Sequence, residues 1–192
     1  PPRLHLLGRI IEQSATAPVL FIGTARPEFA SPWPARSNTT TLQLALTAAN
    51  RLTHEILEGL TVHDLRAACP NVVVAHPAGV IQGVDQLFTG RVERIDTAFL
   101  QSLLDQSDVP IVPPLGFDGN GNTYRLKSDS VAVAVATHLK AVKLIFVTSQ
   151  PGLVHRGRPI RQMPVGDLSD LLHRDGTGFA PEMLSRARHA VQ

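Results

Sequence analysis

The chain has 192 residues, of which 43% are hydrophobic and 18% are charged, and its formal net charge is +2. This length and composition fit one globular domain or slightly more, and they exclude an intrinsically disordered chain. The basic residues are dispersed, so no nucleic-acid partner is expected. The single cysteine, Cys69, excludes an intrachain disulfide and a cysteine-rich zinc site. No apolar run is long enough for a membrane span and no signal peptide is visible, so we expect a cytoplasmic location.

The N-terminal third shows both helical and strand-like patterns. Apolar spacing predicts helices over residues 4–13 and 48–60. A short continuous apolar run predicts a buried strand over residues 18–23. Residues 30–38, rich in proline and small side chains, are typical of a loop. Alternating Thr and Leu over residues 39–46 favours a strand.

The middle of the chain continues with short elements. Residues 64–69 favour a short helical turn, which Pro70 ends. Residues 71–75 and 89–94 are predicted to be strands. Asp96 is expected to cap a helix over residues 97–104, because its carboxylate can accept a hydrogen bond from a free amide of the first turn.

A glycine-rich turn divides the next two elements. Residues 110–114 predict a strand interrupted by prolines, and residues 118–122 predict a tight turn. The following helix is expected over residues 130–141, with Ser128 or Asp129 as its cap.

The last quarter begins with the clearest apolar run in the sequence, residues 143–148, which predicts a buried strand. Residues 154–163 indicate a hairpin or extended loop around Arg156 and Gly157. Short helices are expected over residues 167–172 and 181–191, the second with proline at its first position. This alternation of strands and helices predicts an α/β fold, with an open, mainly parallel sheet and helices on both faces.

In such folds, ligands bind beyond the carboxyl ends of the strands. Three strand ends stand out, at residues 23–28, 115–122 and 148–152. Small residues there let backbone amides approach a phosphate, although they would serve tight turns equally well. The predicted nucleotide-contacting residues are Gly116, Gly119, Gly121, Thr148, Ser149, Pro151 and Gly152. The sequence has no complete phosphate-binding loop, no hydrolase nucleophile elbow and no metal-binding histidine pair.

Asp129 follows the glycine-rich turn at the start of a predicted helix. A capping carboxylate there would stabilise the helix by roughly 0.5–2 kcal/mol, which accounts for the residue without any ligand. The same carboxylate could instead organise a lysine or magnesium ion beside a phosphate. Both interpretations of Asp129 stay open at this point.

Three segments, in order, resemble one family. They are "VVVAHPAGVIQGVDQLFTGRVERID", "VPIVPPLGFDGNGNTYRLKSDSVAVAVATHLKAVKLIFVTSQPGL" and "APEMLSRARHAV". Together they resemble the amino-acid kinase domain of bacterial N-acetylglutamate synthases and the related N-acetylglutamate kinases, over residues 71–191. The resemblance implies an open, mainly parallel sheet between helices, a place in arginine biosynthesis, and ATP as the one cofactor that the fold could take.

The sequence departs from the kinase pattern at several positions. Arg125 stands where the family has an asparagine that holds the acyl-amino-acid substrate, so Arg125 is the candidate substrate-binding residue. The acidic position is kept as Asp129, but Ser149 replaces a second acidic residue. The Lys-x-Gly-Gly phosphate loop is missing and no lysine follows Lys143. Phosphoryl transfer needs such cations, so kinase activity is not expected.

In the synthases, acetyl transfer belongs to a separate C-terminal acetyltransferase domain, and this sequence ends at Gln192. The resemblance therefore implies an effector-binding and structural domain whose nearest enzyme class is amino-acid N-acetyltransferase. Its expected ligand is arginine or acetylglutamate, and it is expected to form a homo-oligomer.

A second resemblance covers "PVLFIGTARPEFASPWPARSNTTTLQLALT", which is similar to a segment of AAA/STAND-type ATPases. It implies an alternative function, a regulatory or protein-interaction module without catalysis. The expected domains are thus an N-terminal α/β segment of uncertain origin over residues 1–60 and an incomplete amino-acid-kinase-like domain over residues 61–192.

Overall fold

A computed structural model describes residues 38–147 and 152–191. The elements predicted over residues 4–13 and 18–23, and all but the last residue of the predicted loop 30–38, lie outside the described residues. The chain divides into two compact units, Pro1–Ile145 and Phe146–Gln192. Each unit is described by itself below.

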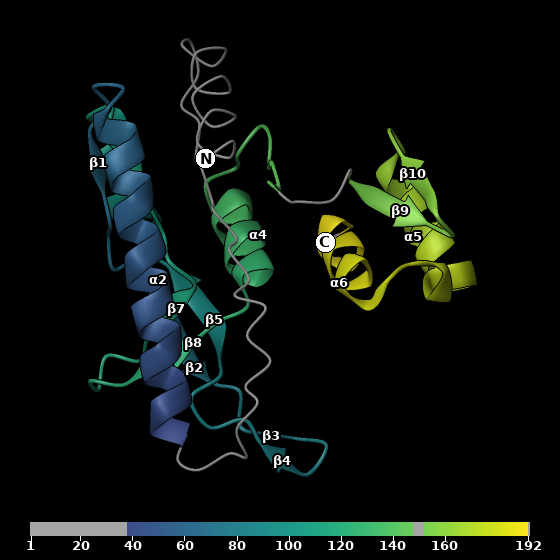
Figure 1. Ribbon diagram of the computed structural model, residues 1–192, viewed down its shortest axis with the longest axis horizontal. Helices are drawn as coiled ribbons and strands as arrows, with labels where there is room; N and C mark the ends of the chain where they lie inside the picture. Colours follow the sequence, from purple (N-terminus) through teal and green to yellow (C-terminus); the bar gives the residue numbers. More distant parts are fainter. Residues whose placement is uncertain (1–37, 148–151, 192) are drawn as a thin grey trace. The chain divides into compact units, whose positions relative to one another are not determined.

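The first unit is built on a four-stranded sheet in the order β5-β2-β7-β8 (Figure 1). Its strands are β2 (Val73–Pro77), β5 (Gly90–Ile95), β7 (Leu115–Phe117) and β8 (Thr123–Arg125). β2 pairs antiparallel with β5 and parallel with β7, and β7 and β8 form an antiparallel hairpin. The sheet is mixed, and the predicted strands over residues 71–75 and 89–94 are confirmed within two residues at each end.

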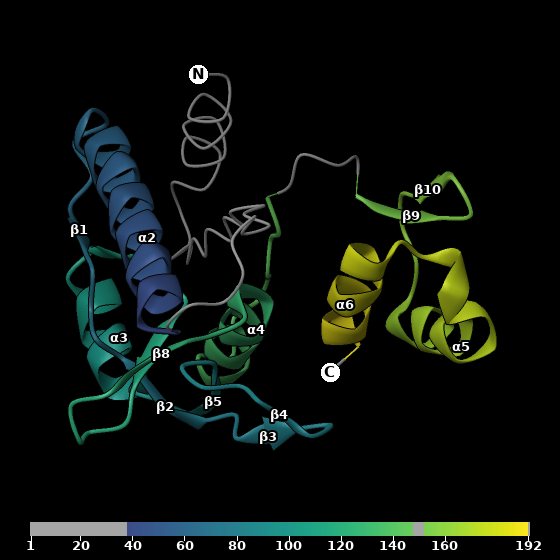
Figure 2. The ribbon, with the colours of Figure 1, turned by 60° about the horizontal axis from the view of Figure 1, so that its bottom comes forward.

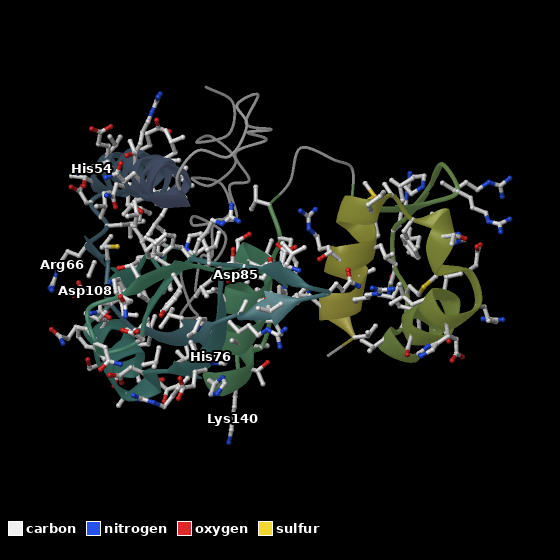
Figure 3. All side chains as sticks on the ribbon, turned by 90° about the horizontal axis from the view of Figure 1, so that it is seen from below. His54, Arg66, His76, Asp85, Asp108 and Lys140 are labelled. Atoms are coloured by element: carbon white, nitrogen blue, oxygen red, sulfur yellow. The ribbon has the colours of Figure 1, made fainter. Side chains whose placement is uncertain are left out.

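Helices cover both faces of this sheet, which confirms the predicted α/β class. They are α2 (Asn38–Thr61), α3 (Thr97–Asp105) and α4 (Ser128–His138). Figure 3 shows α2, which carries His54, on one side of the strands, and α4, which ends shortly before Lys140, on the other. Buried apolar side chains of the strands and helices fill the space between the layers: Leu60, Val72, Val73, Ala75, Ile95, Leu100, Leu103, Ile111, Val112, Leu115, Tyr124, Leu126, Val131, Ala132 and Val135.

The two predicted helix caps had different outcomes. Asp96 caps α3 as expected, since its Oδ1 accepts a hydrogen bond from the Phe99 amide at 3.0 Å. The prediction for α4 was wrong, because that helix begins at Ser128 with Lys127 in the cap position and no side-chain cap bond. The Lys127 carbonyl already accepts the Val131 amide, which leaves Asp129 inside the first turn.

Short strand pairs complete the first unit. β1 (Ala67–Ala68) pairs parallel with β6 (Val109–Pro110), so the helical turn predicted over residues 64–69 was wrong. Arg66 and Asp108, which precede these strands, form an ion pair with Nε and Oδ1 2.9 Å apart (Figure 3). β3 (Val80–Ile81) and β4 (Val84–Asp85) form a small hairpin with exposed apolar side chains.

Three predicted strands were wrong. Of residues 110–114, only Pro110 lies in a strand, at the end of β6, because Pro113 and Pro114 have no amide hydrogen for a strand ladder. Residues 39–46 lie in the long helix α2, because Leu42 and Leu46, four residues apart, continue the helical spacing of the apolar face of residues 48–60. Residues 143–147 form no strand, and they are exposed or half-buried rather than buried. An apolar run becomes a buried strand only when neighbouring strands complete its hydrogen bonds, and no strand in the described residues pairs with this one.

The second unit combines a hairpin with two helices (Figure 2). β9 (Leu153–His155) pairs antiparallel with β10 (Arg158–Ile160), and the turn residues Arg156 and Gly157 have φ values of +48° and +77°. Positive φ at both positions is typical of a type I′ turn, whose twist matches that of the strands. The hairpin predicted here is confirmed.

The remaining elements of the second unit are α5 (Val165–Asp175), the 3₁₀ turn η1 (Gly176–Gly178) and α6 (Pro181–Ala190), which confirm both predicted helices. The buried core of this unit consists of Leu168, Phe179, Met183 and Ala187. Of the helices in the described residues, none has the length and apolar character that a bilayer crossing requires.

Candidate functional site

Gly116 lies inside the sheet rather than in a loop. It is buried in β7, and a Cβ atom added there would meet the Ala75 Cβ of β2 and lie 3.0 Å from Leu126 Cδ1. The glycine is needed because β7 approaches β2 closely. The structure thus gives Gly116 a packing role in the sheet.

Gly119 and Gly121 lie in the exposed loop between β7 and β8, with φ values of +78° and +91°. The Asp118 carboxylate organises this loop. Its Oδ1 accepts the amides of Asn120 and Asn122 at 2.8 and 3.1 Å, and its Oδ2 accepts the Asn122 side-chain amide at 2.7 Å. The predicted tight turn is confirmed, and the loop is ordered by its own side chain.

These hydrogen bonds also change the acidity of the groups around the loop. The Asn122 side chain, followed by the two backbone amides, holds the pKa of Asp118 below its ordinary value. The pKa of Tyr124, whose hydroxyl donates to Asp118 Oδ2 at 3.2 Å, is raised by burial and by the same carboxylate. These hydrogen bonds therefore favour the ionised form of Asp118.

Arg125 and Asp129 differ in accessibility. Arg125 is exposed on β8, and its guanidinium Nη2 donates to Thr89 Oγ1 at 3.4 Å. Asp129 lies in the first turn of α4 with only 3% of its surface exposed, and it is the one buried charged side chain in the part of the chain that the structure describes. The positive end of the helix dipole stabilises a carboxylate at this position.

The third predicted strand end falls mostly outside the described residues. Thr148, Ser149 and Pro151 are among the residues that the structure does not describe. Gly152 is described, is exposed, and has a φ of +112°, a conformation that favours glycine. It belongs to the second unit, whereas the glycines of the β7–β8 loop belong to the first.

A cluster of polar side chains in the second unit had not been predicted. Asp175, at the end of α5, contacts the β9–β10 hairpin. Its Oδ2 lies 3.0 Å from His155 Nε2 and 2.7 Å from Arg156 Nε, and its Oδ1 accepts a hydrogen bond from Thr177 Oγ1 at 3.3 Å. The Arg156 guanidinium holds the pKa of Asp175 below its ordinary value, and the carboxylate in turn raises the pKa of Arg156.

Further contacts hold the hairpin in place on η1 and the unit's core. The His155 ring packs on the buried Phe179 ring with centroids 4.8 Å apart. The Arg156 amide donates to the Gly178 carbonyl at 2.8 Å. A Cβ atom added at Gly178 would overlap the His155 ring, so this approach also depends on glycine.

Beside this cluster lies an open groove with a volume of about 540 Å³. It combines cationic or polar side chains of the hairpin with apolar side chains that continue to α5. The lining residues are His155, Arg156, Arg158, Pro159, Ile160, Met163 and Leu171. Within residues 38–147 and 152–191, no three His, Cys, Asp or Glu side chains gather where they could hold a metal ion.

The chain belongs to the amino acid kinase family, because the family model matches residues 17–192. Among curated proteins, it is 35% identical over 129 residues to amino-acid acetyltransferases of Pseudomonas putida and of Pseudomonas aeruginosa. Each alignment covers 67% of this chain and 30% of the relative. The chain thus spans less than a third of the length of these relatives, and the predicted homology to N-acetylglutamate synthase is confirmed for this part.

Solved structures show the same fold. An N-acetylglutamate synthase of Neisseria gonorrhoeae, complexed with coenzyme A and N-acetyl-glutamate, matches 97% of this chain and 41% of its own, with a TM-score of 0.73 and 24% identity. The same synthase complexed with coenzyme A and L-arginine gives a TM-score of 0.67 and 22% identity, over 97% of this chain and 43% of its own. The predicted fold is confirmed.

The family model also bears on the N-terminal resemblance. The match begins at residue 17, so it includes residues 18–47, which had been compared with AAA/STAND-type ATPases. The comparisons give the ATPase resemblance no support.

Proposed function

We propose that this chain is the amino-acid-kinase domain of an N-acetylglutamate synthase and that it serves arginine biosynthesis by binding a small effector. The observation that carries the proposal is the 35% identity over 129 residues to amino-acid acetyltransferases. The effector is arginine or acetylglutamate, since related synthase structures were determined with each of these molecules. Acetyl transfer would then be the activity of the whole protein.

The proposal excludes phosphoryl transfer by this chain. No lysine follows Lys143 in the sequence, and arginine does not reproduce the point charge of a phosphate-binding lysine. Asp129 keeps the family's acidic position but is buried in the first turn of α4. We retain Asp129 as a residue that organises the site and Arg125 as its substrate-binding residue, with Gly119 and Gly121 of the β7–β8 loop as its boundary within the first unit. The domain division near residue 60, the homo-oligomer and the cytoplasmic location remain parts of the proposal.

Thermal unfolding of the purified chain tests the proposal. Melting is followed alone and with millimolar L-arginine, acetylglutamate or Mg-ATP, with D-arginine as the matched control. A ligand present at 100 times its Kd stabilises the folded state by about 2.7 kcal/mol, which is a readily measured rise in the melting temperature. We expect L-arginine or acetylglutamate to raise the melting temperature and D-arginine to leave it unchanged.

Two other results would contradict the proposal in different ways. A rise with Mg-ATP alone would show a nucleotide-binding domain without the effector function. No rise with any of the three would mean that the chain binds none of these ligands by itself. Light scattering of the same sample measures the oligomeric state.

A further inference from the structure

The groove of the second unit lies between the β9–β10 hairpin and α5. We propose that it binds a small molecule that carries a carboxylate or phosphate group on an apolar body. This proposal goes beyond the effector function above and does not depend on it. The argument rests on the shape of the groove, on its charge and on the contacts that hold its walls.

The groove suits a small molecule in size and in the chemistry of one wall. Its volume of about 540 Å³ lies within the range of roughly 300–1,000 Å³ that small-molecule sites occupy. Ile160, Met163 and Leu171 line it and also pack against the unit's buried core. This apolar wall is therefore fixed by the core behind it and would bury the apolar body of a ligand.

The hairpin side of the groove is cationic. His155 and Arg158 are directly paired across the hairpin, so their side chains leave the same face of the two strands. Ile160 follows Arg158 by two residues and shares that face as well. All three line the groove, so Arg158 and the apolar side chain of Ile160 are neighbours on one face of the hairpin.

The charge of Arg158 is not neutralised within the described residues. The carboxylate of the cluster, Asp175, is already engaged by His155, Arg156 and Thr177. Arg158 makes no ion pair or hydrogen bond in the described part of the chain, and no acidic side chain lines the groove. A guanidinium with its donors unused binds carboxylate or phosphate with two parallel hydrogen bonds.

The walls are held in place without a ligand. The type I′ turn fixes the hairpin, the Asp175 carboxylate ties it to the end of α5, and the Arg156 amide bonds to the Gly178 carbonyl. Ligand binding would therefore fix little additional backbone around the groove, so the loss of conformational entropy would reduce the affinity only slightly. The geometry supports a preformed site for an acidic ligand.

The experiment uses the full chain labelled with ¹⁵N and phenylacetate as the probe. Binding is measured from amide chemical shifts of β9, β10 and α5 during titration. Phenyl phosphate, neutral 2-phenylethanol and cationic phenethylamine are titrated in parallel. We expect phenylacetate to bind about tenfold more tightly than 2-phenylethanol, which corresponds to about 1.4 kcal/mol, and phenethylamine to bind most weakly. A comparison of phenylacetate with phenyl phosphate identifies the preferred acidic group.

The variant Arg158→Met removes the charge and keeps an apolar stem of similar length. We expect it to weaken phenylacetate binding about tenfold, the size of one charge-assisted interaction, and to leave 2-phenylethanol binding unchanged. The matched control is Arg161→Met, which removes the same charge from an exposed side chain of the same unit outside the groove. Arg161→Met should bind like the unmodified chain, and Arg158→Lys should restore part of the affinity.

Equal binding of phenylacetate and 2-phenylethanol by the unmodified chain would overturn the proposal without any variant. An equal loss in Arg158→Met and Arg161→Met would also overturn it, because the attraction would then come from the unit's general positive charge. Shift changes confined to residues outside the hairpin and α5 would place binding elsewhere and overturn the site.

Discussion

Gly116 offers the sharpest test of how the sheet is packed. We predict that Gly116→Ala destabilises the first unit by about 2–3 kcal/mol, in the upper part of the range for overpacked cores. The added Cβ would overlap the Ala75 Cβ, which is attached directly to the β2 backbone and cannot turn away. Leu126 Cδ1, at 3.0 Å, limits movement in another direction. The overlap can be removed only if β2 and β7 move apart. This movement is costly because the two strands are hydrogen-bonded neighbours in the sheet.

A double-mutant cycle measures this contact. Urea unfolding followed by circular dichroism gives the free energies of unfolding, and hydrogen exchange assigns the change to the first or the second unit. Ala75→Gly removes the opposing methyl group, so the double variant should recover at least about 1 kcal/mol relative to additivity. Gly119→Ala is the control. It meets no atom within 4 Å and should cost only about 1 kcal/mol for its left-handed backbone.

Two results would refute the packing argument. A Gly116→Ala variant within about 0.5 kcal/mol of the original chain would show that the strands absorb a methyl group easily. An additive double variant would show that the cost does not come from the contact with Ala75. Loss of effector binding in a fully stable Gly116→Ala chain would instead indicate that Gly116 has a role in ligand binding besides packing.

Three further predictions concern helix ends and charge. Asp96→Ala removes the hydrogen bond to the Phe99 amide and should cost about 1 kcal/mol, measured by urea unfolding; Asp96→Asn should cost much less. Asp175→Asn should lower the melting temperature of the second unit. The pKa of Asp175 is lower in the folded chain than in the unfolded chain, where it is near 3.9. Its ionised carboxylate therefore contributes fully to the stability of the folded state above that pH, and this contribution is lost as the pH falls further. The difference in stability between Asp175→Asn and the original chain should vanish in strong acid. A Cβ atom added at Gly166 in α5 would meet no atom within 4 Å, and Gly166 has no positive φ. Because alanine favours a helix more than glycine does, Gly166→Ala should stabilise the second unit by about 0.5 kcal/mol in thermal melts. A loss of stability would contradict this argument.

Features set by a few neighbouring residues could be predicted from the sequence. The Asp96 cap depends on an amide three residues away. The β9–β10 turn depends on the Arg156-Gly157 pair, and the β7–β8 loop depends on contacts that Asp118 makes within six residues. In each case the physical cause lies inside the segment, so the pattern predicts the structure.

Features that depend on distant partners could not be predicted in this way. Residues 39–46 alternate like a strand, but the pattern that continues through residue 60 makes them part of one long helix. Residues 143–147 are as apolar as a buried strand, yet a strand requires partners that composition does not reveal. Asp175 lies 20 residues from His155, and no local signal connects the two. The groove beside them follows from tertiary contacts.

The type I′ turn of the second unit also affects the order in which the chain gains structure. The β9–β10 hairpin closes a loop of two residues, whereas the parallel pairing of Val74 with Phe117 closes a loop of about 40 residues. The entropic cost of closing a loop grows with the logarithm of its length, so pairing Val74 with Phe117 costs about 2–3 kcal/mol more than closing the hairpin. Hairpins form within about 1–10 microseconds, and sheets with distant pairings form much later. When the unfolded chain refolds, the cationic hairpin that lines the groove should therefore form before the strands of the first unit pair. Pulse-labelled hydrogen exchange measures this order, and the opposite order would contradict the argument from loop length.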